Sequence, residues 1–90
     1  MQTDSNAFDV QVVALESVSI TPSPAGQTLT TEEGTWSFGP TVQVSGNDIL
    51  LNGVRTGAGV RIFTENGVLY HLNALGARYF RLGTSWVQST

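Results

Sequence analysis

The stretch VRIFTENGVLYHL, residues 60–72, decides the fold class. Two runs rich in β-branched and aromatic residues lie on either side of the dipeptide Asn66-Gly67. Asn and Gly tolerate positive φ angles, so the dipeptide favours a type I′ turn and the two runs are predicted to pair as a β-hairpin. The run Ile49–Leu51 ends at a second such dipeptide, Asn52-Gly53, which predicts another hairpin.

The rest of the chain also has the pattern of strands separated by turns. Turn signals recur about every 8–14 residues, a spacing typical of all-β domains. No window has apolar residues at helical spacing over three turns without an interrupting Gly or Pro. We therefore predict an all-β fold: an antiparallel β-meander, sandwich or barrel-like domain. The strand 35–38 is expected to stop at Gly39-Pro40, and the small residues 57–59 are expected to form a flexible hairpin tip.

The sequence predicts an N-terminal arm, residues 1–23, before a compact domain, residues 24–90. Phe8, Val10 and Val12 alternate with polar residues and form one apolar face of an extended strand. The alternation shifts at Val13–Ala14, which suggests a bulge or a change of sheet. An uncovered apolar edge invites a strand or surface of another molecule, so these three residues are the candidates for attachment.

Composition limits the classes of partner and compartment. The 90 residues suit one small domain with a thin core, and no cysteine can staple it, so we expect self-association. Four arginines, no lysine and a net charge of −3 disfavour nucleic acid as a partner. The longest apolar run is four residues, Val12–Leu15, so membrane insertion is not expected, and no secretory signal is recognised.

Residues that could carry chemistry are few. His71 is the single histidine, and no Gly-x-Ser-x-Gly nucleophile motif accompanies it. The carboxylates are scattered along the chain, at Asp4, Asp9, Glu16, Glu32, Glu33, Asp48 and Glu65. We predict that the protein is not an enzyme, binds no cofactor or metal, and keeps His71 as a structural or surface residue.

Aromatic residues are the more informative set. Trp36 and Trp86 are expected to fill the core, because large rings supply much of the burial in a small domain. Tyr79 and Phe80 are adjacent, so a strand must send one of them away from the core. The candidate contact patch for glycan or protein comprises Tyr70, Arg78, Tyr79 and Arg81.

Several short motifs recur in an order that resembles a small β module of proteobacteria and their phages. The matching stretches lie between Pro24 and Val87, and they are 24–30, 34–39, 49–53, 66–70, 76–80 and 85–87. The module occurs in phage virion proteins and as an accessory segment of secreted carbohydrate-active proteins. Relatives commonly carry a tryptophan in the penultimate motif, where this chain has Tyr79-Phe80. The resemblance implies a non-catalytic module exposed on the exterior of an assembly.

Two functions follow as expectations. The first is a phage virion accessory protein, either a capsid decoration (cement) protein or a small head or tail fibre subunit. It would be assembled in the host cytoplasm, bind a capsid, tail or fibre protein of the same particle, and form a homo-oligomer. The alternative is a carbohydrate-binding or adhesin module, extracellular or on a cell surface, with exposed aromatic residues that stack on sugar.

Overall fold

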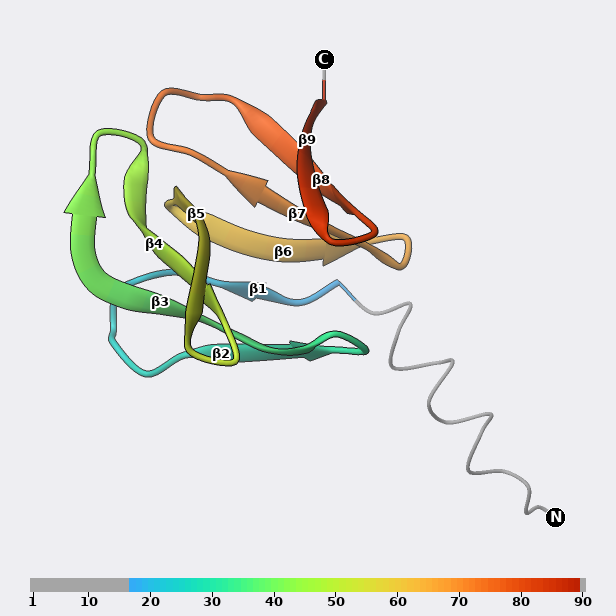
Figure 1. The fold of residues 1–90 in the computed structure, drawn as a ribbon, viewed down its shortest axis with the longest axis horizontal. Coiled ribbons are helices and arrows are strands. Elements are labelled where there is room, and N and C mark those ends of the chain that lie inside the picture. The colour runs from blue at the N-terminus through green and yellow to red at the C-terminus, as the bar shows by residue number, and fades with distance from the viewer. Residues whose placement is uncertain (1–16, 90) are drawn as a thin grey trace, which may run out of the picture.

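The computed structural model describes residues 17–89, which form nine strands in two antiparallel sheets and contain no helix (Figure 1). The strands are β1 (Ser19–Ile20), β2 (Thr28–Thr31), β3 (Gly34–Gln43), β4 (Gly46–Leu51), β5 (Val54–Gly59), β6 (Arg61–Glu65), β7 (Val68–Leu72), β8 (Arg78–Leu82) and β9 (Ser85–Ser89). The all-β prediction is confirmed for this part of the chain.

Each sheet is a meander of consecutive strands. The four-stranded sheet has the order β2-β3-β4-β5, after which the chain turns a corner at Val60 into the second sheet. The amide of Val60 holds this corner by donating a 2.8 Å hydrogen bond to the carbonyl of Leu72. The second sheet has the order β1-β6-β7-β8-β9, so the first strand of the domain joins the later meander at its β6 edge. This crossover ties the start of the domain to its second half.

Both Asn-Gly dipeptides form the hairpin turns that the sequence predicts. Asn52 and Gly53 have φ angles of 52° and 83° between β4 and β5, and Asn66 and Gly67 have 53° and 78° between β6 and β7. Positive φ at both central positions is the requirement of a type I′ turn, whose twist matches that of the paired strands.

The core lies between the two sheets and draws on both. Its buried members are Ile20, Leu29, Trp36, Ile49, Ile62 and Leu69, and Phe38, Leu51 and Trp86 pack against them. Trp36 is fully buried, and its ring centroid lies 5.4 Å from that of Trp86 on the opposite sheet. Both indole N–H groups are satisfied, because Trp36 donates to Thr31 Oγ1 and Trp86 donates to Thr56 Oγ1. The two tryptophans are thus packing residues, as predicted.

The folded domain begins earlier in the chain than the sequence indicates. Ile20 is only 5% exposed and pairs with Ile62, so β1 is an integral strand although it lies inside the predicted arm 1–23. The alternation of Val18, Ser19 and Ile20 indicates a strand, but the two prolines that follow it indicate a connecting segment, so the predicted boundary fell after β1. The predicted attachment residues Phe8, Val10 and Val12, and the predicted bulge at 13–14, lie outside the described residues.

Two further expectations are wrong in detail. Residues 57–59 are not a hairpin tip but the end of β5, where Ala58 and Gly59 are buried. Gly39-Pro40 does not end a strand, because β3 continues to Gln43 through an irregularity between Phe38 and Val42. In both places residues that favour turns lie inside a strand. Their residue types therefore predict a turn where the strand continues.

Candidate functional site

The outward faces of the two sheets differ in chemistry. The outward side chains of the four-stranded sheet are mainly polar, and they include Thr28, Thr30, Thr35, Ser37, Asp48 and Arg55 around Leu50. The outward apolar side chains of the five-stranded sheet are Phe63, Val68, Tyr70, Leu72, Phe80, Leu82 and Val87, with Arg61, Arg78 and Glu65 among them. We call this second surface the aromatic face. A solvated sheet face normally alternates to polar residues, so an apolar outward face is the unusual feature.

The register places the outward residues of the aromatic face in three rows across the strands. The middle row runs through Phe63, Tyr70, Phe80 and Val87, preceded by Ser19 at the β1 edge. One flanking row contains Arg61, Leu72, Arg78 and Ser89. The other contains the pair Glu65 and Val68 and the pair Leu82 and Ser85. Positive charge therefore lies on one side of the aromatic row and the carboxylate lies on the other.

Arginine side chains cover part of the aromatic row. The guanidinium of Arg61 lies 4.3 Å from the centroid of Phe63, whose ring stacks on Tyr70 at 5.3 Å. Arg78 lies 4.3 Å from the Tyr70 centroid and reaches Glu65, with 2.7 Å between Arg78 Nη2 and Glu65 Oε1. Cation–π contacts keep Arg61 and Arg78 close to the rings and explain how outward Phe63 is only 8% exposed.

The four candidate patch residues lie on two different faces of the sheet. Tyr70 and Arg78 contact each other on the aromatic face. Tyr79 and Arg81 instead point inward, where Tyr79 stacks on His71 and Arg81 lies near the rings of Trp36 and Trp86. The sequence therefore does not define a single patch of these four, and Phe80 is the aromatic residue of the pair 79–80 that turns outward.

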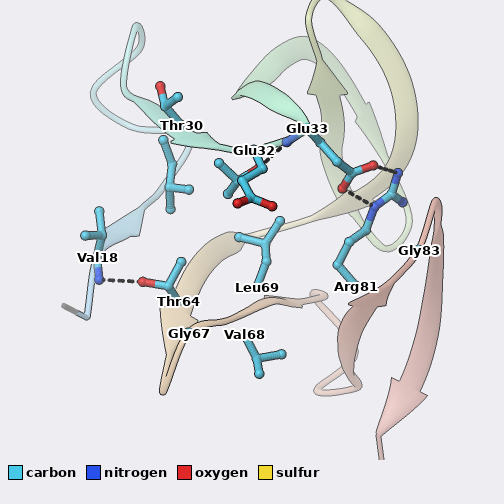
Figure 2. A pocket seen from close by; sticks show the side chains of 12 residues that line it. Val18, Thr30, Glu32, Glu33, Thr64, Gly67, Val68, Leu69, Arg81 and Gly83 are labelled. Atoms are coloured by element: carbon cyan, nitrogen blue, oxygen red, sulfur yellow. Dashed lines mark hydrogen bonds and ion pairs between the residues drawn. The ribbon is translucent and has the colours of Figure 1, made fainter. Parts of the chain in front are cut away.

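Arg81 joins the two sheets through a carboxylate. Its Nε and Nη2 atoms donate to the two oxygens of Glu33 at 2.9 and 3.1 Å, a bidentate geometry shown in Figure 2. The Arg81 side chain is only 9% exposed, and its guanidinium lies 5.0 Å from the Trp36 centroid. Because burial is favourable for a guanidinium only with its charge and donors satisfied, we assign Arg81 a structural role.

An open groove of about 700 Å³ lies beside this ion pair. Val18, Leu29, Val68 and Leu69 supply apolar walls, and Glu33 and Arg81 close one end (Figure 2). The backbone amide of Val18 donates to Thr64 Oγ1 at 3.0 Å, which anchors the start of the described chain at the other end. The polar groups at both ends are bonded within the protein.

His71 is an interior residue held by rings. It is 3% exposed, stacks on Tyr79 with centroids 4.7 Å apart, and meets Trp86 edge-on at 4.4 Å. Burial lowers the pKa of His71 from 6.5 to about 4, so the imidazole is neutral near pH 7. Its Nδ1 atom has no hydrogen-bond partner among the described residues. The described contacts of the imidazole are with aromatic rings, and this environment suits packing.

The described residues contain neither a metal-binding cluster nor a membrane-spanning helix. No three His, Asp or Glu side chains among residues 17–89 are close enough to hold a metal ion. The described segment also contains no helix able to cross a bilayer. The aromatic face is therefore the strongest candidate functional surface.

Comparison with known proteins adds no identification. No family model, curated protein or solved structure matches the chain.

Sequence reasoning missed Phe63 and Phe80 as surface residues. A signal was present, because Arg61, Phe63 and Glu65 alternate with buried Ile62 along β6. Once the turn at Asn66-Gly67 sets the register, Phe63 must lie opposite Tyr70. To predict the aromatic row, the register between paired strands must be known as well as the position of each strand.

Proposed function

We propose that this chain is a non-catalytic accessory protein of a phage virion, either a capsid decoration protein or a small head or tail fibre subunit. It would attach to the particle and display its β domain outward. The observation that carries the proposal is the contrast between the two sheet faces. A molecule fixed in an assembly needs one surface that contacts its neighbours and another that faces water. The aromatic face fits the first role and the face rich in Thr and Ser fits the second.

The second support is the small, tightly connected sandwich. Its strands are joined by short turns, and its buried titratable groups, His71 and Arg81, are engaged in packing and an ion pair. Such a domain supplies a rigid displayed body with little machinery for chemistry. Phe8, Val10 and Val12 precede it in the chain and stay the predicted attachment residues.

The test is whether the protein is a component of particles. Virions from the strain that encodes the chain are purified on a density gradient, and an antibody against the domain is used to probe the fractions. We expect the protein to band with the particles and to be labelled on their exterior by immunogold microscopy. Absence from intact, infectious particles would refute the proposal.

The attachment step is tested with a truncation placed by the structure. Deleting residues 1–16 leaves β1 and the core residue Ile20 intact, whereas a deletion through residue 20 would remove both. The shorter deletion should give a soluble β domain that no longer binds particles lacking the endogenous protein. Full binding by the truncated domain would place attachment elsewhere.

A carbohydrate-binding module is the second candidate function. The feature in its favour is the row of rings beside Arg61 and Arg78, since aromatic faces and polar side chains together can hold sugars. A glycan array probed with the full chain tests it, and Tyr70→Ala should abolish any positive signal. A uniformly negative array would remove this candidate.

A further inference from the structure

We propose that the aromatic face is the contact surface of a symmetric dimer, in which two copies stack their five-stranded sheets face to face. The occupant of the face is thus a second copy of the same chain. This inference concerns the domain itself and does not depend on the virion proposal.

The first argument is the cost of leaving the face open. Leu82 is 61% exposed on β8, and Phe80 and Val87 are only partly buried beside it. The opposite surface also exposes Val42 and Val54, but Thr and Ser occupy its outward positions on β2 and on the first half of β3. Association that covers the side chains of the aromatic face removes apolar area from water.

The second argument is that the face is complementary in charge to itself. On β6, Arg61 and Glu65 lie on either side of Phe63 and point to the same side of the sheet. Two residues of strand on each side separate their backbone positions by roughly 13 Å. A twofold axis along the aromatic row reverses the partner's strands, so Arg61 of each copy comes opposite Glu65 of the other.

The charges also select this arrangement over its alternative. A twofold axis parallel to the strands would bring the row with Arg61 and Arg78 against the same row of the second copy, which places like charges together. The axis along the aromatic row instead yields two equivalent Arg61–Glu65 contacts, as an isologous interface requires. Stacked sheets pack about 10 Å apart, a gap that Arg and Glu side chains can bridge.

Arg61 has the freedom that this contact needs. Its Nε donates to the Ser19 hydroxyl and its guanidinium lies over the Phe63 ring, and neither partner is a carboxylate. Glu65 has one oxygen bonded to Arg78 at 2.7 Å and is largely exposed, so its second oxygen can accept from another donor. The dimer therefore adds an ion pair without breaking one.

Sedimentation equilibrium of the full chain tests the proposal, at concentrations from about 1 to about 500 μM. We expect a reversible monomer–dimer equilibrium in this range. Val87→Asp should weaken it by about 30-fold or more, because Val87 lies in the middle row, where the twofold axis brings it against Val87 of the other copy and would place two like charges together. Val42→Asp is the matched control: Val42 is 69% exposed on the four-stranded sheet, and its change should leave the dissociation constant within about threefold.

A charge exchange tests the register. Arg61→Glu and Glu65→Arg should each weaken the dimer by about tenfold, and the double variant should recover most of the wild-type affinity. Circular dichroism of each variant checks that the fold is kept.

Three outcomes overturn the proposal. The first is a wild type that stays monomeric throughout the concentration range. The second is equal effects of Val87→Asp and Val42→Asp, and the third is a double variant no tighter than the single ones. A monomer that binds glycans through Tyr70 would assign the face to carbohydrate instead.

Discussion

The buried imidazole of His71 should make the domain sensitive to acid, and His71→Leu should remove that sensitivity. Its pKa is 6.5 when exposed and about 4 in the folded protein, so the unfolded chain binds the extra proton between these values. The free energy of unfolding therefore has its full value with respect to His71 above about pH 6.5, and it decreases as the pH is lowered toward 4. The loss is about 2 kcal/mol between pH 7 and pH 5 and about 3 kcal/mol below pH 4. For a domain of this size, that is a large share of the free energy of unfolding.

Urea unfolding at pH 7, 6 and 5, followed by tryptophan fluorescence, measures the effect. The leucine side chain fills similar volume between Tyr79 and Trp86 but does not titrate. Carboxylates that titrate in the same range are shared by both proteins, so the difference between wild type and variant isolates His71. We expect this difference to change by about 2 kcal/mol from pH 7 to pH 5 in favour of the variant. Parallel pH profiles, or an NMR titration of folded His71 near 6.5, would refute the reasoning.

Four substitutions and one control test the core and the Arg81 ion pair by chemical denaturation followed by circular dichroism. Trp36→Ala should lower the free energy of unfolding by about 3–5 kcal/mol because its ring is fully buried. Trp86→Ala should lower it by less, because that ring is only partly buried. Equal and negligible losses for the two variants would contradict the packing described. Gly59→Ala should cost about 1–3 kcal/mol, since its new methyl group would lie 2.8 Å from the Leu72 carbonyl oxygen, and an unchanged midpoint would show that β5 can shift. Glu33→Gln should cost about 1–2 kcal/mol by weakening the bond to nearly buried Arg81. Its control, Glu65→Gln, acts on an exposed pair and should cost under about 0.5 kcal/mol, so a larger cost for the control would reverse our ranking.

The fold class was predictable because it depends on local signals. Asn66-Gly67 and Asn52-Gly53 specify positive φ angles through their own chemistry, whatever packs around them. The place of strand β1 was not predictable in the same way. The alternation of Val18, Ser19 and Ile20 indicates a strand, but Ile20 becomes a core residue only through pairing with Ile62, far along the chain.

The candidate surface was predictable in part, for a reason that lies in strand geometry. Alternation shows that Tyr79 and Phe80 point in opposite directions, but it does not show which of the two faces the core. The direction is set by tertiary contacts: Tyr79 stacks on His71, and Arg81 binds Glu33 across the sheets. Arg81 was predicted to belong to a contact patch, because its carboxylate partner Glu33 lies 48 positions away in the sequence and could not be foreseen.

The glycines of β5 explain how so thin a domain holds a cluster of large rings. A Cβ atom at Gly57 would lie 3.3 Å from Trp86 Cδ1, and one at Gly59 would lie 3.0 Å from His71 Cδ2. Because Gly57 and Gly59 have no side chains, β5 leaves the space that Trp86 and His71 of the opposite sheet occupy. Small residues facing large ones fill a core at normal density without many aliphatic side chains. This use of small residues opposite large rings also explains why the prediction of a flexible tip at 57–59 was wrong. Glycine can serve either close packing or a flexible turn, depending on which residues lie opposite it. The sequence of a single strand does not show those residues.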